Sequence, residues 1–141
     1  MIKTITSQNF RRYGKIIAYP NKHLKGKKKN LFCIVLTEGK HTGWRIAYLI
    51  VRDKRIRRLE RHPFSFESFE PMVGKALLYV TEKKDKNRIE CFYLDRPIIL
   101  NKGVWHGVVT QSTESEMKLT ENLKVKCHYW PLGFYLGSPH E

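Results

Sequence analysis

Residues 60–72, ERHPFSFESFEPM, place a carboxylate, a guanidinium and an imidazole side by side in a segment whose pattern is otherwise typical of a β-strand. Residues two apart in a strand share a face, so Glu60 and His62 point the same way and Arg61 points the opposite way. The proline that follows restricts His62 to an extended backbone, which holds its imidazole where the strand directs it. Glu67 comes five residues later, and a return of the chain over HPFSF would bring its carboxylate back. One face of this stretch is therefore predicted to line a pocket.

A second candidate histidine, His106, lies further along the chain in the segment NKGVWHGV, where glycines flank it and Trp105 precedes it. Two imidazoles and two carboxylates form a donor set that suits a divalent transition metal such as Ni, Mn, Fe or Zn. The candidate metal ligands are Glu60, His62, Glu67 and His106. The other histidines are assigned no role.

The rest of the chain has the pattern of short β-strands with almost no helix. Strands are expected at residues 15–19, 31–37, 44–51, 55–61, 75–81, 89–95, 96–100, 103–110 and 123–130. In the fourth of these runs Ile56 and Leu59 are out of phase, which predicts a bulge or a bend. Residues 111–122 are polar and are expected to form a connection. Turn signals between so many short strands favour a single all-β domain over residues 1–141, built as a sandwich or a barrel.

Three local features are expected at the turns and termini. LFCIVLT and WRIAYLIV flank EGKHTG, a loop with two glycines, which predicts a β-hairpin. A short N-terminal helix is expected to begin at Ser7, to carry Phe10 and Tyr13, and to end at Gly14 in a left-handed conformation. The tail PLGFYLGSPHE is expected to pack its aromatic side chains on the barrel or on a second subunit, with a mobile end as the alternative.

The net charge of +14 is concentrated in three runs, at residues 22–30, 52–58 and 81–88. A positive field of this size attracts anions and nucleic acids, but the same charges are also compatible with solvated loops that keep the protein soluble. Two of these runs contain Gly or Asn and have the composition of loop tips. Neither of the two carries the interleaved aromatic residues of a base-stacking surface. Nucleic-acid binding therefore remains a weaker alternative to solvated loops.

The cysteines and the hydropathy limit the remaining protein classes. Cys33, Cys91 and Cys127 are odd in number and widely spaced, which argues against a disulfide framework or a zinc ribbon and favours free buried thiols. No apolar run approaches the length of a membrane span, and the N-terminus lacks the apolar stretch of a signal peptide. We therefore expect a soluble, cytoplasmic protein with no membrane contact.

The motif spacing is similar to that of the cupins, which are jelly-roll barrels with two metal-binding motifs. The order Glu60-x-His62-x4-Glu67, followed later by His106, fits the cupin pattern if Glu60 occupies the place of the first cupin histidine. Within the cupins, ERHPFSFESFEPM and NKGVWHGVV resemble the two signature stretches of the ureidoglycolate lyases, formerly called ureidoglycolate hydrolases. That family's pattern runs Glu-Arg-His-Pro, then Gln, an aromatic residue and Pro, and later Gly-x-Trp-His-His.

The resemblance covers positions 2 to about 110, because ITSQNFRRYGKII also resembles the opening of that family. Two positions depart from the family pattern. Glu67 stands where the family usually has Gln, which adds a carboxylate to the pocket. Gly107 stands where a second histidine is common, which removes a proton donor.

The resemblance implies a cupin-type double-stranded β-helix, that is, a jelly-roll barrel, assembled as a homodimer. It implies a carbon–nitrogen lyase of the amidine-lyase type that cleaves ureidoglycolate to glyoxylate and urea in allantoin degradation, with a divalent metal as the possible cofactor. In this interpretation His62 or Glu60 is the base and His106 the acid, whereas Arg61 and Trp105 bind the small carboxylate substrate.

Two other hypotheses from different classes stay open at this point. The first is a cupin that binds a metal, or acts on another carboxylated or sugar ligand, without lyase activity, which the exchange of Gln for Glu67 motivates. The second is a basic protein that associates with nucleic acid, which the net charge motivates.

Overall fold

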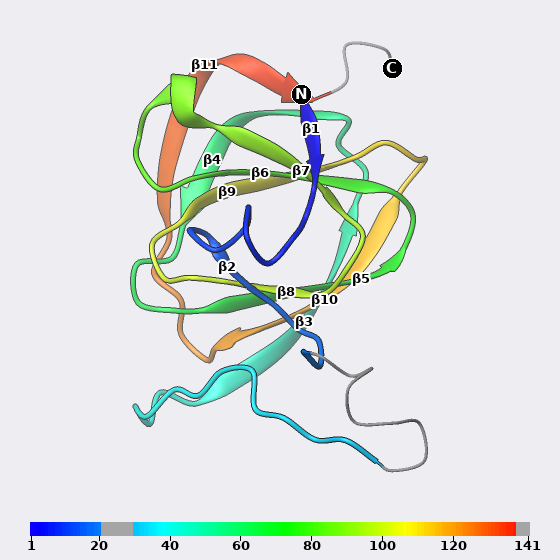
Figure 1. The fold of residues 1–141 in the computed structure, drawn as a ribbon. Helices are drawn as coiled ribbons and strands as arrows, with labels where there is room; N and C mark the ends of the chain where they lie inside the picture. Colours follow the sequence, from blue (N-terminus) through cyan, green and yellow to red (C-terminus); the bar gives the residue numbers. More distant parts are fainter. Residues whose placement is uncertain (21–29, 138–141) are drawn as a thin grey trace.

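The computed structural model describes residues 1–20 and 30–137, which form two β-sheets that enclose one core (Figure 1). The first sheet has six strands in the order β1-β7-β6-β9-β4-β11, and the second has five in the order β2-β8-β5-β10-β3. The strands are β1 (Ile2–Thr4), β2 (Gly14–Ile16), β3 (Trp44–Val51), β4 (Arg55–Arg61), β5 (Glu67–Val73), β6 (Ala76–Thr81), β7 (Glu90–Leu94), β8 (Ile98–Leu100), β9 (Trp105–Thr110), β10 (Ser115–Asn122) and β11 (His128–Gly137). A 3-10 turn, η2 (Lys86–Arg88), lies between β6 and β7.

The path of the chain between the two sheets confirms the jelly-roll barrel. From β3 to β11 each connection carries the chain from one sheet to the other, except the β6–β7 hairpin, which stays within the six-stranded sheet. This alternation brings strands that are far apart in sequence next to each other, as in double-sheet jelly rolls. β4 therefore lies between β9 and β11, and β5 between β8 and β10.

The core lies between the two sheets and is built from inward-facing residues of both. Its largest fully buried side chains include Phe10, Phe92, Leu78, Leu94 and Met117. Phe10, Tyr13 and Phe92 form an edge-to-face aromatic cluster with ring centroids 5.3–5.9 Å apart. Aromatic pairs of this geometry stabilise a core beyond the area that they bury.

Residues 115–122 form strand β10, so the prediction of a connection over residues 111–122 is wrong. Side chains alternate between buried and partly exposed along β10, with Met117 and Leu119 facing the core. Polar residues occupy the other positions, and they hid this alternation in the sequence. β10 is a central strand that pairs with both β5 and β3, so its backbone hydrogen bonds are made within the sheet.

The expected hairpin between residues 31–37 and 44–51 is also wrong, because only the second run is a strand. β2 and β3 lie at opposite edges of the five-stranded sheet, so the chain between them has to cross from one edge to the other. Val35 is still close to β2, where its carbonyl oxygen accepts a hydrogen bond of 3.4 Å from Lys15 Nζ. The run 31–37 is thus part of the crossing segment.

The N-terminal helix does not form, and a series of turns replaces it over residues 7–13. The side chain of Thr6, rather than that of Ser7, accepts a hydrogen bond at the start of the turns, from the backbone N–H of Asn9. Gly14 lacks a positive φ and is needed for another reason. A Cβ atom at position 14 would lie 1.7 Å from the carbonyl oxygen of Ile99 on β8.

A bulge or bend was predicted in residues 55–61, and the pairing of β4 with β11 is irregular in this region. The register of this pair shifts between Pro131 and Leu136 of β11, opposite Ile56 and Arg58 of β4. The aromatic tail packs on the barrel up to Gly137, since it forms the second half of β11.

The cysteines are free thiols in the structure, as expected, but they are less buried than expected: Cys33 and Cys91 are partly buried and Cys127 is exposed. Most of the lysine run at residues 22–30, together with His23, lies outside the described residues, as do His140 and the end of the tail. In the described part of the chain, no helix has the length and apolar character that crossing a membrane requires.

Candidate active site

The candidate site is built by strands of both sheets. Glu60 on β4 pairs directly with His106 on β9 in the six-stranded sheet. His62 follows the end of β4, and the chain then turns and enters β5 of the opposite sheet at Glu67. The return of the chain over HPFSF that the sequence suggested therefore takes place, and it sets Glu67 across the barrel interior from the two histidines.

Hydrogen bonds fix the turn between His62 and Glu67. The carbonyl oxygen of His62 accepts a bond of 2.9 Å from the backbone N–H of Gly103, just before β9. Ser65 Oγ accepts a bond of 3.0 Å from the backbone N–H of Asn122 at the end of β10. The turn is thus held by neighbours from both sheets, which limits how far the two side chains can move apart.

Three buried side chains converge on one point of the barrel interior. Glu67 Oε1 lies 3.2 Å from His62 Nε2 and 3.1 Å from His106 Nε2. The two imidazole rings meet edge to face with centroids 5.1 Å apart. His62, Glu67 and His106 are 6%, 6% and 3% exposed, so water has little access to the contact.

The hydrogen bonding of the two histidines leaves the converging nitrogens available. His106 Nδ1 lies 3.0 Å from the carbonyl oxygen of Val104, and because a carbonyl can only accept, Nδ1 carries the proton. His62 Nδ1 lies 3.4 Å from Cys127 Sγ. Within the described residues, neither Glu67 Oε1 nor His106 Nε2 has a well-aligned hydrogen-bond partner, although both atoms are buried.

The arrangement fits a divalent metal ion. The three converging atoms lie within 4.8 Å of one another and offer two neutral imidazole nitrogens and one carboxylate oxygen. Buried polar atoms that lack partners carry a desolvation cost, which a bound cation would remove. The bond from His106 Nδ1 to a backbone carbonyl is the kind of contact that orients metal-bound histidines. His62, Glu67 and His106 would hold the ion.

Electrostatic coupling within this cluster shifts the pKa values of its members. Burial disfavours the charged imidazole, but the interaction with Glu67 outweighs it and raises the pKa of both His62 and His106. Burial would raise the pKa of Glu67, yet the two imidazoles hold it well below its usual range. Burial and the nearby negative charge of Glu67 raise the pKa of Glu121, which pairs with Arg45 at 2.6 Å.

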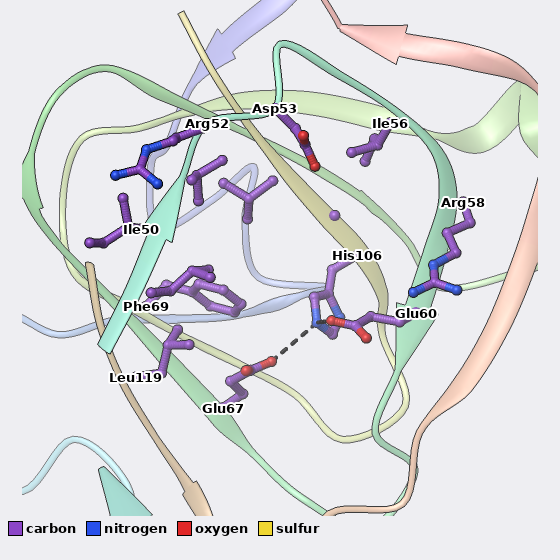
Figure 2. A pocket seen from close by; sticks show the side chains of 14 residues that line it. Ile50, Arg52, Asp53, Ile56, Arg58, Glu60, Glu67, Phe69, His106 and Leu119 are labelled. Carbon is purple, nitrogen blue, oxygen red and sulfur yellow. Dashed lines mark ion pairs between the residues drawn. The ribbon is translucent and has the colours of Figure 1, made fainter. Parts of the chain in front are cut away.

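A cavity of about 530 Å³ opens next to this cluster. Its wall includes Glu67 and His106, together with Glu60 and Arg58 of β4. Figure 2 shows Glu60 and Glu67 approaching His106 from different sides, with Arg58 beside Glu60. Glu60 Oε1 is 3.8 Å from His106 Nε2, and 40% of its side chain is exposed. Glu60 is therefore easier for a ligand in the cavity to reach than Glu67, of which only 6% is exposed.

Arg61 and Trp105 lie away from the cavity and pack against each other. The guanidinium of Arg61 lies over the Trp105 ring at 4.8 Å, and its Nε donates a hydrogen bond of 3.1 Å to His128 Nδ1. Trp105 also meets Trp130 edge to face. Side chains alternate between the two faces of β4, so Arg61 points away from the face that carries Glu60. The structure thus does not support their assignment as substrate-binding residues.

Two residues near the site were missed by the sequence reasoning. Arg58 shares the inward face of β4 with Glu60, and the same spacing of two residues could have identified it. Cys127 reaches His62 because His128 pairs with Arg61, and the antiparallel register continues to the next pair. No local signal in the sequence indicates that pairing.

The model of one family, ureidoglycolate lyase, matches residues 1–121. The chain belongs to the ureidoglycolate lyase family. The match covers the whole cluster of His62, Glu67 and His106 as well as Glu60. The protein is thus a ureidoglycolate lyase-like cupin and belongs to a family of lyases.

Comparisons with individual proteins are less close. Solved structures of oxalate decarboxylase from Bacillus subtilis are similar to this chain, among them one determined at pH 4.6 and one from a study of the Mn(II) centres of that enzyme. Each has 18% sequence identity and a TM-score of 0.48, and the match covers 64% of this chain. It spans only 24% of the oxalate decarboxylase chain. No curated protein sequence matches this one.

The structure gives a physical reason for one departure from the family pattern. Gly107 stands on β9 where a second histidine is common, and a Cβ atom there would come within 2.3 Å of Ile56 Cδ1 and 3.0 Å of Leu59 Cδ2. β4 packs so closely on this position that a larger side chain requires Ile56 to move. The other departure, Glu67, supplies the carboxylate on which the buried cluster is centred.

The cluster predicts how the stability of the metal-free protein depends on pH. The raised pKa values of His62 and His106 stabilise the fold below about 6.5, and this contribution is lost as pH rises through their folded-state values. The lowered pKa of Glu67 stabilises it above about 4.5. We therefore expect the free energy of unfolding, measured with urea in excess chelator, to fall as pH rises above about 6.5 and through the raised pKa values of the two histidines.

The variant Glu67→Gln should lose most of this dependence on pH, because its side chain cannot balance the charge of either imidazole. The raised pKa of Glu121 also makes the fold less stable as pH rises, as the raised pKa values of the histidines do. Removing the charge of Glu67 weakens this contribution of Glu121 as well. Glu70→Gln is the matched control, since Glu70 lies on the same strand but pairs with Lys118 at 3.3 Å. Equal pH dependence in wild type and Glu67→Gln would contradict this account of the cluster.

Proposed function

We propose that this protein cleaves ureidoglycolate to glyoxylate and urea with the help of a divalent metal ion. The observation that carries the proposal is the convergence of His62, Glu67 and His106 on one buried point in the wall of a cavity, with Glu60 beside them. A bound ion would act as a Lewis acid that polarises the oxygens of the substrate. The cavity of about 530 Å³ has room for this small substrate.

Glu60 is the best-placed general base. The substrate carries a hydroxyl group and a urea nitrogen on the same carbon, so cleavage requires removal of the hydroxyl proton as the carbon–nitrogen bond breaks. The Glu60 carboxylate lines the cavity and is partly exposed, whereas the carboxylate of Glu67 is enclosed between two imidazoles. After taking the hydroxyl proton, Glu60 can return it to the departing nitrogen, which balances the reaction as glyoxylate plus urea.

His106 is better suited to holding the ion than to the acid role that the sequence suggested. Its Nδ1 is engaged by the carbonyl oxygen of Val104, and its Nε2 faces Glu67. Neither nitrogen is therefore free to protonate a leaving group in the cavity. We assign His62, Glu67 and His106 to the ion and proton transfer to Glu60.

Arg58 is the proposed partner of the substrate carboxylate. It extends from the same face of β4 as Glu60 and lines the cavity. Its guanidinium stacks over the Tyr129 ring at 4.3 Å, which holds the group in place. Arg52 also lines the cavity, but it already pairs with Glu114 at 2.9 Å. A guanidinium suits a carboxylate because it can donate two parallel hydrogen bonds.

The reaction and its division of roles can be tested by measuring urea and glyoxylate release by the purified, metal-loaded protein. Glu60→Gln should lower kcat by about 10²–10⁴-fold while the bound metal is retained, because only proton transfer is lost. His62→Ala and His106→Ala should lose both activity and bound metal.

His128→Ala is the control, because this imidazole contacts Arg61 and lies outside the cluster. It should leave both activity and metal content close to wild type. Absence of turnover with any divalent ion would exclude the proposed reaction, and full activity of Glu60→Gln would exclude Glu60 as the base.

Arg58→Ala should raise KM for ureidoglycolate by about 10–100-fold with a smaller effect on kcat, as expected for loss of one charged hydrogen-bonding group. Arg58→Lys should restore part of the affinity. Arg57→Ala is the matched control, since Arg57 lies on the opposite face of β4, over the Tyr135 ring. Steady-state kinetics that give the same KM for Arg58→Ala and wild type would rule out this contact.

A further inference from the structure

The edge strand β2 lines a second cavity, which the proposed reaction does not use. This cavity has a volume of about 730 Å³, and it shares no lining residue with the cavity beside His106. Its wall is formed by the turns before β2, by β2 itself and by residues 18–20, together with Arg96 and Asn101 on either side of β8. We call this cavity the β2 groove.

Three cationic side chains line the β2 groove, and its described lining residues include no Asp or Glu. The cations are Arg11, Lys15 and Arg96, and all three residues are exposed. Within the part of the chain that the structure describes, none of them takes part in an ion pair. Lys15 Nζ donates a hydrogen bond of 3.4 Å to the carbonyl oxygen of Val35, which leaves its charge uncompensated. Asp95, the acidic neighbour of Arg96 in the sequence, lines a different cavity.

The next residue after Arg11 shows what is special about this groove. Arg12 lines another cavity, and Glu82 and Glu90 are part of the wall there. In the β2 groove, by contrast, three like charges line one cavity without a counter-charge among the described residues, and their mutual repulsion costs free energy. A bound anion would remove this cost. The groove therefore has the electrostatic character of an anion-binding site.

The pairing of β2 with β8 sets the shape of the groove. The two strands are antiparallel neighbours, so Arg96 before β8 and Asn101 after it mark opposite ends. An extended chain covers about 16 Å over the five residue steps between them. Asn101 Nδ2 donates a hydrogen bond of 3.3 Å to the carbonyl oxygen of Arg12, so the turn that carries Arg11 lies at the Asn101 end. Arg11 and Arg96 are thus at opposite ends of an elongated groove, with Lys15 of β2 between them.

The groove also offers neutral hydrogen-bond donors and an apolar surface. Thr6 Oγ1 accepts a hydrogen bond of 3.1 Å from the backbone N–H of Asn9, so its own hydroxyl proton stays available to a ligand. Ser7 adds a second hydroxyl to the wall. Residues 18–20, an alanine, a tyrosine and a proline, supply apolar surface for a carbon skeleton.

We propose that the β2 groove binds a small organic molecule that carries a phosphate group at each end. One phosphate contacts Arg11 and Lys15, and the other contacts Arg96. A phosphate group carries about two negative charges and three acceptor oxygens, and a guanidinium can donate two parallel hydrogen bonds to it. Two phosphates therefore balance all three cations, which a dicarboxylate does not. This site is independent of the proposed reaction, so each can fail without the other.

The site can be tested by isothermal titration calorimetry of the full chain. Fructose bisphosphate is the probe, because it carries phosphates on its first and last carbons, and wild type should bind it. Arg11→Ala and Arg96→Ala should each weaken binding by about 10-fold, since each removes one charged hydrogen-bonding group. Arg12→Ala is the matched control, because this neighbouring arginine lines a different cavity. It should leave binding close to wild type.

Two further probes test the chemical class of the ligand. Fructose monophosphate reaches only one end of the groove and should bind wild type about 10-fold more weakly than fructose bisphosphate. Citrate carries three carboxylates on a compact skeleton, so it should also bind more weakly. Arg58→Ala should leave the binding of fructose bisphosphate unchanged, because Arg58 lines the cavity of the candidate active site and not the β2 groove.

Four results would overturn the proposal. The first is that fructose bisphosphate does not bind. The second is an equal loss of binding in Arg11→Ala and Arg12→Ala, which would indicate general attraction by the net positive charge. The third is citrate binding as tight as that of fructose bisphosphate, which would exclude phosphate recognition. The fourth is loss of binding in Arg58→Ala, which would place the probe in the active-site cavity.

Discussion

The site depends on one buried carboxylate, Glu67, held between two imidazoles that come from different parts of the chain. Its Oε1 lies just over 3 Å from both ring nitrogens in a region that water barely reaches. An isolated charge there would be costly, so the carboxylate needs cationic partners, either protonated histidines or a metal ion. The jelly-roll path meets this requirement, because it sets the start of β5 opposite β4 and β9.

The barrel also separates the parts of the site that bind from those that react. Two members of the buried cluster, Glu67 and His106, form part of the cavity wall, whereas Glu60 and Arg58 project from the same face of β4 into the cavity. A ligand can thus contact a base and a guanidinium without displacing the cluster. On the opposite face of the same strand, Arg61 packs with Trp105 and stabilises the barrel wall instead.

The alternation of side chains along a strand was enough to predict which residues near His62 share a face of the site. The spacing of two residues placed Glu60 and His62 on one face and Arg61 on the other, and the structure agrees. The motif resemblance, rather than any local rule, joined these residues to His106. Cys127 could not be predicted, since its contact with His62 depends on the pairing of β11 with β4. Strand β10 was missed because polar residues occupy six of its eight positions, although its buried positions alternate regularly.

The central claim is that Glu67 Oε1 and the Nε2 atoms of His62 and His106 share one cation. Diffraction from crystals soaked in Mn²⁺ or Ni²⁺, recorded at the absorption edge of the metal, tests this claim most directly. The account predicts an anomalous peak within bonding distance of all three atoms. Crystals in which these side chains are well ordered but no peak lies between them would contradict it, as would imidazole rings that point away from Glu67.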